Sequence, residues 1–346
     1  MGELIACWSR RRLDFKFEAI TSRDRMRHKD TFYIKVWRED EPLKFGLGEA
    51  ALFRGLSPDD RPDYEAKLSE VCENIESYVA DMGRLDAWPS IKMGLETALS
   101  DLENGAAHRP FVERFDPIKI NGLIWMGDKA LMLDRLARKL DEGFGCIKIK
   151  IGGIDEQEEY DMLRLLRREA PGVELRLDAN GAFKPSEALE RLKRLSEFNI
   201  HSIEQPIARG QLPEMAALCE VSPIPIALDE ELIGVTGDER CRMLDAIKPD
   251  YIILKPTLCG GFSGAQVWIE EAEKRGIGWW VTSALESNVG LNAIARFVAS
   301  HRTPLPQGLG TGELYYNNIP SPLVREGEWL CADESKGWEL PDFEWN

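Results

Sequence analysis

The spacing of hydrophobic residues changes near residue 115, and the two parts of the chain predict different structures. In the first part, the strand-like runs TFYIKVW and LKFGLGEAALF precede two segments whose apolar residues recur at helical spacing. Strands grouped together and followed by grouped helices are typical of an α+β unit. We therefore predict an α+β domain over residues 1–112.

The second part alternates short apolar runs with amphipathic segments such as DKALMLDRLARKLDEG and PSEALERLKRLSEF. This alternation predicts parallel strands joined by crossover helices, in a closed α/β barrel over residues 113–317. A doubly wound open sheet is the alternative. The final segment, 318–346, loses the alternation and is predicted to pack back on the first domain. The apolar runs are IKINGLIW, CIKIKIG, ELRLDAN, HSIEQP, PIALDE, YIILKP, GWWVTSALES and PQGLGTGELY.

The charge composition limits the classes of molecule that the chain is expected to bind. Its 346 residues carry 44 Lys and Arg against 60 Asp and Glu, a formal net charge of −16. Nucleic acids and anionic membrane surfaces both require basic patches, so this balance argues against either partner and leaves a small anionic substrate open. The seven cysteines are scattered without a C-x-x-C pair, and the sequence has no 18-residue apolar run and no secretory signal. We therefore expect a soluble, cytoplasmic protein with reduced thiols.

Charged residues gather at the ends of the predicted barrel strands. In CIKIKIGG, strand alternation puts Lys148 and Lys150 on one face and the isoleucines on the other. An amphipathic surface strand would show the same pattern, so the surroundings decide. Active sites of barrels form at the C-terminal ends of the strands, where the later runs also carry polar residues. These are Asp178 and Asn180, Glu204, Asp229 and Glu230, and Lys255.

Three carboxylates end three consecutive runs. Asp178, Glu204 and Asp229 lie 26 and 25 residues apart, about one strand-helix unit each. Side by side they would repel one another unless a cation lay among them. All-oxygen ligands favour a hard divalent ion, Mg²⁺ in particular. The alternative is that each acid caps the helix after its strand.

The motifs KIK, LDAN, IEQP, LDE and LKP occur in this order, and together they resemble the enolase superfamily, in its muconate-lactonising subgroup. The resemblance covers most of the chain. It implies a modified TIM barrel, (β/α)7β, with an α+β capping domain that the C-terminal segment completes. It also implies that Asp178, Glu204 and Asp229 bind Mg²⁺, which Mn²⁺ could replace because both ions accept oxygen ligands.

The same resemblance assigns the lysines. Enolase-superfamily sites use a Lys or His base and Mg²⁺ to form an ene-diolate from a carboxylate substrate. Lys150 matches the acid/base lysine, and Lys255 matches the lysine on the opposite face of the substrate. Lys148 would hold Lys150 in place. In a barrel these lysines face inward while the isoleucines pack outward.

Three further segments, GLGEAALFRGLSPD, SALESNVG and GLGTGELYYNN, resemble o-succinylbenzoate synthases, and the last lacks the D-x-D pair usual in dipeptide epimerases. The expected reaction is Mg-dependent syn-dehydration of 2-succinyl-6-hydroxy-2,4-cyclohexadiene-1-carboxylate to 2-succinylbenzoate, a step of menaquinone biosynthesis. A structural ion pair is the alternative for Arg176, and a plain turn is the alternative for GLGTG. The expected substrate-binding residues are Arg176, Asn180, Ser283, Gly308, Gly310 and Thr311.

Two other functions stay open. A dipeptide epimerase or N-acylamino acid racemase would use Lys150 and Lys255 as opposed bases. A catalytically silent binding barrel would be expected to have lost a site motif, and all five are intact. The sequence makes no prediction of the oligomeric state.

A loop over residues 20–30, ITSRDRMRHKD, is expected to close over the mouth of the barrel. Its arginines Arg23, Arg25 and Arg27 could attract a substrate carboxylate. The alternative is a solvated charge run with no role in binding.

Overall fold

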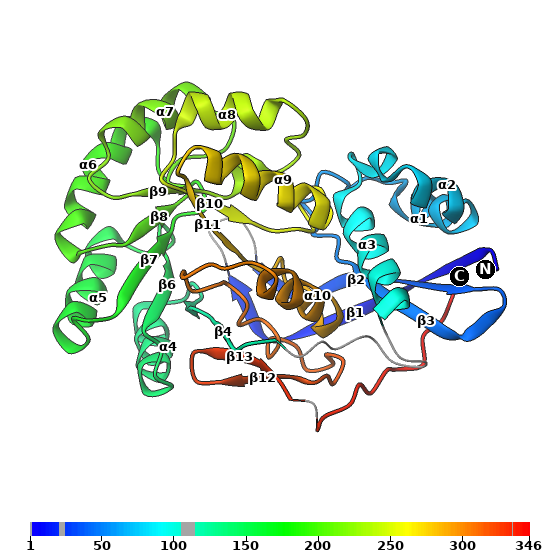
Figure 1. Cartoon of the computed structure of the whole chain (residues 1–346). Helices are drawn as coiled ribbons and strands as arrows, with labels where there is room; N and C mark the ends of the chain where they lie inside the picture. Colours follow the sequence, from blue (N-terminus) through cyan, green and yellow to red (C-terminus); the bar gives the residue numbers. More distant parts are fainter. Residues whose placement is uncertain (1, 21–24, 105–114, 334) are drawn as a thin grey trace.

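The computed structural model describes residues 2–20, 25–104, 115–333 and 335–346. The N-terminal part of the chain forms an antiparallel sheet in the order β1-β2-β3, with helices packed on one face (Figure 1). Its elements are β1 (Leu4–Ile20), β2 (Arg25–Arg38), β3 (Glu41–Ala50), α1 (Tyr64–Glu73), α2 (Ile75–Ala80), the 3-10 turn η1 (Met82–Leu85) and α3 (Pro89–Asn104).

Helix α3 approaches strand β3 so closely that only glycine fits between them. A Cβ atom on Gly46 would lie 1.8 Å from the carbonyl oxygen of Ala98, and one on Gly48 would lie 1.9 Å from that of Gly94. The two glycines are two residues apart and therefore share the face of β3 that the helix covers. The sequence FGLGE thus encodes the contact between sheet and helix as well as a strand.

The second part of the chain forms a parallel sheet of seven strands in the order β11-β10-β9-β8-β7-β6-β5, with a helix after each strand (Figure 1). The strands are β5 (Gly122–Ile124), β6 (Cys146–Lys150), β7 (Glu174–Asp178), β8 (Ser202–Glu204), β9 (Ile226–Leu228), β10 (Tyr251–Leu254) and β11 (Gly278–Val281). The helices are α4 (Lys129–Asp141), α5 (Glu156–Glu169), α6 (Pro185–Leu195), α7 (Leu212–Val221), α8 (Glu239–Ile247), α9 (Gly261–Lys274) and α10 (Asn288–Ala299).

Residues 307 and 308 close this sheet into a barrel. Gly308 makes a parallel bridge to Thr282 at the end of β11, and Gln307 makes one to Ile120 just before β5. The predicted eighth run, PQGLGTGELY, is therefore present as two bridges and not as a full strand. The closed barrel predicted from the sequence is confirmed, and the open doubly wound sheet was wrong.

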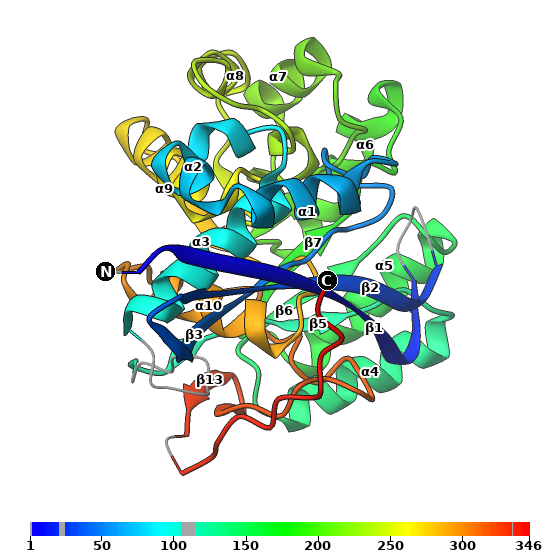
Figure 2. The same ribbon diagram turned by 90° about the vertical axis from the view of Figure 1, so that its right-hand side faces the viewer.

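A small antiparallel sheet joins the two ends of the barrel segment. The predicted run IKINGLIW divides: its first half forms β4 (Ile118–Lys119), which pairs with β13 (Trp329–Ala332) and through it with β12 (Leu323–Glu326). Beyond this sheet, the chain returns to the N-terminal sheet and ends beside β1 (Figure 2). There Trp338, Phe343 and Trp345 pack near Tyr33 and Leu47, and the backbone of Asn346 pairs with that of Trp8.

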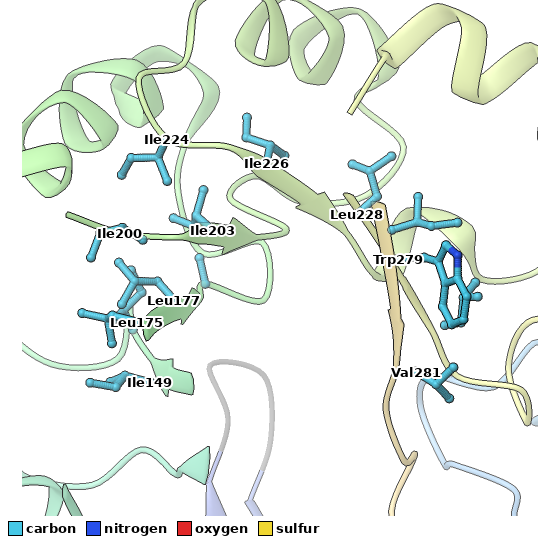
Figure 3. Close-up of a cluster of buried hydrophobic side chains, with 14 of the residues drawn as sticks. Ile149, Leu175, Leu177, Ile200, Ile203, Ile224, Ile226, Leu228, Trp279 and Val281 are labelled. Atoms are coloured by element: carbon cyan, nitrogen blue, oxygen red, sulfur yellow. The ribbon is translucent and has the colours of Figure 1, made fainter. Parts of the chain in front are cut away.

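Side chains of the barrel strands alternate between two environments. Leucines and isoleucines such as Ile149, Leu177 and Ile203 point outward into the layer between strands and helices (Figure 3). Burial of each contributes roughly 1.5–3 kcal/mol to stability. Their neighbours Lys150, Asp178 and Glu204 therefore point into the barrel, in one layer, because Lys150 pairs in register with Asp178 and Asp178 with Glu204.

Two carboxylates of the N-terminal part contact the first turns of barrel helices. Glu96 on α3 accepts hydrogen bonds from Phe262 N (2.6 Å) and Ser263 N (3.3 Å) at the start of α9. Glu49 at the end of β3 accepts bonds from Ser287 N (2.8 Å) and Gly290 N (2.8 Å) at the start of α10. Helix N-termini present unpaired N–H groups and a partial positive charge, so each carboxylate stabilises the contact.

Among the residues that the structure describes, no helix combines the length and the apolar character that a membrane crossing requires.

Candidate active site

Strand β6 places its two lysines against the acids of the next two strands. Lys148 Nζ lies 2.7 Å from Glu204 Oε2 and 3.0 Å from Asp178 Oδ2. Lys150 Nζ lies 2.8 Å from the same Asp178 Oδ2 and 2.8 Å from Asn180 Oδ1. The lysines thus share one carboxylate oxygen, which fixes their positions relative to each other.

A third lysine reaches the site from the other side of the barrel. Lys255 follows β10 and forms an ion pair with Asp229, which follows β9. In the sheet order, β10 is four strands away from β6, which is half-way around a barrel of eight strands. The ammonium groups of Lys150 and Lys255 therefore approach the barrel mouth from opposite walls.

For two of the three carboxylates, neighbouring ammonium groups lower the pKa by more than burial raises it. Burial by itself raises the pKa of Asp178 and Asp229, since both side chains are within the interior. Lys148 and Lys150 nevertheless hold the pKa of Asp178 well below its usual range. Lys255 likewise lowers the pKa of Asp229. Both aspartates are therefore carboxylates at neutral pH.

Of the three carboxylates, Glu204 is the one whose negative charge is least stabilised by its neighbours. Burial raises its pKa well above the usual range, and the negative charge of Asp178 raises it further, against the opposing effect of Lys148. Its Oε1 atom is buried and has no hydrogen-bond partner among the described residues. For Lys148, burial lowers the pKa but the charges of Asp178 and Glu204 outweigh it, so the pKa is raised.

The three carboxylates fit a hard divalent cation by chemistry. They supply oxygen donors only, they converge from adjacent strands, and Glu204 Oε1 is an unused buried acceptor. Within the described ranges, no three His, Cys, Asp or Glu side chains are arranged around a common ion position as they stand. Lysine ammonium groups bridge the carboxylates instead.

A cavity of about 530 Å³ opens above these groups. Its wall includes apolar side chains of the N-terminal part, such as Phe17, Met26 and Phe53, so both parts of the chain enclose it. Of the residues predicted for the site, Glu204, Asp229 and Arg176 do not reach the cavity wall. Those that do are Lys148, Lys150, Asp178, Asn180, Lys255, Ser283, Gly308, Gly310 and Thr311.

The sequence of the barrel matches a known protein family. Residues 132–337, more than half of the chain, match the family model described as enolase C-terminal domain-like. The chain belongs to the enolase superfamily. Its capped, closed barrel agrees with this membership, and the resemblance seen in the five sequence motifs is confirmed.

Within the superfamily, the most similar relatives include an o-succinylbenzoate synthase of Desulfotalea psychrophila. It is 44% identical over 95% of this chain and 99% of its own length. The crystal structure of MenC from D. psychrophila LSv54 covers 96% of this chain and 100% of its own, with 41% identity and a TM-score of 0.83. The L-Ala-D/L-Glu epimerase of Bacillus subtilis is 31% identical over 47% of this chain and 45% of its own length.

Asn180 and Ser283 are placed differently from simple substrate ligands. Asn180 has a left-handed backbone (φ 45°), and its side chain accepts from Lys150 while donating to Glu230 Oε1 at 3.1 Å. The Ser283 hydroxyl donates to Glu286 Oε2 at 2.6 Å and accepts from Leu285 N at 3.0 Å. Both residues line the cavity, yet their side-chain polar atoms form hydrogen bonds with other groups of the protein. Their predicted contact with substrate stays a prediction.

Arg176 lies one layer deeper in the barrel than Asp178. It pairs in register with Lys148, and its guanidinium donates to Pro306 O at 2.8 Å and to Glu174 Oε1 at 2.9 Å. The guanidinium also stacks on Trp280, 4.3 Å from the ring centre. These contacts match the structural ion pair considered as the alternative for this residue.

Two arginines of the predicted closing loop form ion pairs with strand β1. Arg25 and Arg27 form ion pairs with Glu18 on β1, at 3.4 and 3.1 Å. Both arginine side chains are more than two-thirds exposed, which agrees with a solvated charge run. Arg23 lies outside the described residues.

Sequence reasoning missed the aromatic wall of the cavity. The ring of Trp125, at the end of the run IKINGLIW, lies 5.8 Å from Lys150 Nζ, and Phe17 on β1 packs edge-on against it at 5.9 Å. The position of Trp125 at a strand end was a usable signal. Phe17 gave none, because only the docking of β1 over the barrel brings it there.

Proposed function

We propose that this chain is an o-succinylbenzoate synthase. It would dehydrate 2-succinyl-6-hydroxy-2,4-cyclohexadiene-1-carboxylate to 2-succinylbenzoate, a carbon-oxygen lyase reaction of menaquinone biosynthesis. The observation that carries the proposal is the full-length similarity to the D. psychrophila synthase. The epimerase of B. subtilis is less similar in sequence, with 31% identity over 47% of this chain, so epimerisation is the second choice.

Lys150 is the proposed acid/base of the reaction. Its amine accepts the proton from the carbon next to the ring carboxylate, and the electron pair of that C–H bond forms the new ring double bond. The C–O bond breaks, and Lys150 returns the proton to the departing hydroxyl, so water leaves from the same face. Its position between Asp178 and Asn180, at 2.8 Å from each, supports this role because the side chain is held toward the cavity.

Lys255 and Lys148 have supporting roles in this proposal. Lys255, on the opposite wall, stabilises the negative charge that grows as the proton leaves. Lys148 holds Asp178 and Glu204 in place through its two ion pairs. The aromatic wall at Trp125 excludes water from the reacting carbon.

Asp178, Glu204 and Asp229 are the proposed ligands of Mg²⁺, with Mn²⁺ able to use the same oxygens. When bound, the ion supplies positive charge for the ring carboxylate and so lowers the barrier to proton removal. We further propose that residues 1–112, with 318–346, act as the capping domain and residues 113–317 as the catalytic barrel. The contacts of Trp338, Phe343 and Trp345 near the N-terminal sheet support that division.

The test is turnover of the cyclohexadiene substrate, followed by its loss of ultraviolet absorbance, with Mg²⁺ and with chelator. Loss of a general acid/base costs about 10²- to 10⁴-fold, so Lys150→Ala should lower turnover by that factor. Lys255→Ala removes an electrostatic stabiliser of the developing charge and should lower turnover by about 10²- to 10³-fold. Lys139→Ala is the matched control, because Lys139 lines the same cavity but pairs with Glu142 at its rim. It should retain wild-type turnover.

The outcome against the proposal is equally definite. Wild-type protein that leaves the cyclohexadiene unchanged, yet exchanges the α-proton of a dipeptide or an N-succinylamino acid in deuterated water, is an epimerase or racemase. Protein that binds these ligands without reaction is the silent barrel.

A further inference from the structure

The cavity contains two cations that the proposed chemistry leaves unused. Eight Lys and Arg residues line it, and six of them have a carboxylate partner within the 4.0 Å limit of an ion pair. In the described part of the chain, Lys16 and Arg135 have none. In a protein of net charge −16, a cavity cation that forms no ion pair is available to an anionic ligand.

Arg135 is the better placed of the two. It lies on α4 and is half-buried, whereas Lys16 is exposed on β1. Its Nη1 atom donates to Trp125 O (2.8 Å) and to Met126 O (3.0 Å), which anchors the guanidinium to the end of β5. The ring centre of Phe17 lies 5.4 Å from the guanidinium carbon.

This anchoring leaves the binding edge of the guanidinium unused. An arginine has five N–H donors, and the two carbonyls occupy the two on Nη1. The other three, on Nε and Nη2, have no acceptor among the residues that the structure describes. Nε and Nη2 together form the fork that binds both oxygens of a carboxylate.

Trp125 connects this group to the reaction centre. Its backbone oxygen binds Arg135, and its ring lies 5.8 Å from Lys150 Nζ. One tryptophan residue therefore spans the distance between the proposed base and the unused guanidinium. The cavity thus has a cationic group at each end of an aromatic wall, which suits a ligand with two carboxylates separated by a ring and a short chain.

We propose that Arg135 binds the second carboxylate of the substrate, at the end of its succinyl chain, through Nε and Nη2. This inference rests on the proposed function, because it is that substrate which carries two carboxylates. Arg135 is then a specificity-determining residue: it selects dicarboxylates without touching the carbon that reacts. Phe17, which packs on the guanidinium, would order it from the side of the N-terminal sheet.

The experiment compares wild type with Arg135→Met, which keeps the length and apolar contacts of the stem. A remote contact made equally in ground and transition states changes KM and leaves kcat unchanged. A charge-assisted hydrogen-bond pair corresponds to a roughly 10- to 100-fold change in affinity. We expect KM to rise by that factor and kcat to stay within about threefold. Arg138→Met, one turn further along α4 and paired with Asp134, should change neither.

A second measurement separates binding from structure. The affinity of 2-succinylbenzoate is compared with that of its analogue whose chain-terminal carboxylate is a carboxamide. Wild type should prefer the acid by roughly 10- to 100-fold, Arg135→Met should lose that preference, and Arg135→Lys should recover part of it. A purely structural role for Arg135 would weaken both ligands equally.

Each outcome is decisive. Wild-type protein that turns over the substrate but binds acid and amide equally overturns the inference and leaves the proposed function intact, whether or not the variant folds. Equal losses for both ligands in Arg135→Met also overturn it. Wild-type protein that neither turns over the substrate nor binds 2-succinylbenzoate overturns the proposed function and this inference together.

Discussion

Replacing Glu49 by glutamine tests how the N-terminal part is joined to the barrel. The Glu49 side chain is fully buried, and each of its oxygens accepts one backbone N–H: Oε1 from Ser287 and Oε2 from Gly290, both at 2.8 Å. Oε1 also accepts from the hydroxyl of Thr31 at 2.7 Å, and Oε2 from that of Ser287 at 2.6 Å. A hydroxyl can rotate to become an acceptor, but a backbone N–H cannot.

No rotamer of glutamine satisfies this site. Whichever way the amide is turned, its NH₂ group faces a backbone N–H, so one charge-assisted bond is lost and one buried donor is left unpaired. Such losses cost roughly 1.5–3 and 1–3 kcal/mol and overlap in part, so we expect Glu49→Gln to destabilise the protein by about 3 kcal/mol. Glu65→Gln is the control, because Glu65 forms a half-exposed ion pair with Arg10 and should change stability by under about 0.5 kcal/mol.

The assay is urea unfolding followed by tryptophan fluorescence and by circular dichroism. Coincidence of the two curves establishes one transition, and the shift of its midpoint at constant slope gives the change in free energy of unfolding. A Glu49→Gln variant as stable as Glu65→Gln would refute the argument, since it would mean that these hydrogen bonds do not hold the start of α10.

Two further predictions concern the N-terminal part. Gly48→Ala should destabilise the protein by about 3 kcal/mol in the same urea assay, because the new Cβ would lie 1.9 Å from Gly94 O. Gly172→Ala is the control, because no atom lies within 4 Å of a Cβ at that position. Equal stability of the two variants would contradict the close approach of α3 to β3. Burial raises the pKa of Asp59 to about 6, against the opposing hydrogen bonds from Ser90. The folded state then binds the proton more tightly than the unfolded state, so stability should fall by about 2 kcal/mol as pH rises from 4 to 6, and Asp59→Asn should flatten this slope. Parallel slopes would show that Asp59 does not titrate there.

The sequence could predict the barrel and the lysine and acid layer because both follow from a period of two. Once a strand is recognised, Lys150, Asp178 and Glu204 are fixed on its inner face. The same rule puts Arg176 on the inner face, but it does not say how far from the barrel mouth its side chain ends. Arg176 comes two residues before Asp178 and so lies about 7 Å further from the mouth. At that depth the guanidinium of Arg176 is held by Pro306 and Trp280, and unlike Lys148 in the same layer it does not reach the cavity.

Other features depend on contacts between distant segments and left no local pattern. Strand β1 was missed because Arg10, Arg11 and Arg12 interrupt its apolar residues at the centre. The closing strand of the barrel was overestimated, because two isolated bridges at residues 307 and 308 complete the ring. Arg135 is one of two arginines on an amphipathic helix, and its contact with the end of β5 distinguishes it from Arg138.

The carboxylates that α3 and β3 extend to the barrel also bear on how such enzymes diversify. Glu96 completes the first turn of α9, and Glu49 that of α10, so each of these helices depends on an acceptor encoded more than 160 residues earlier. An exchange of the N-terminal part between two relatives would therefore have to bring matching acids at both positions, or leave two helices with unpaired N–H groups. Inheritance of the two parts as a unit, with variation concentrated in the cavity wall between them, is the outcome that this arrangement favours.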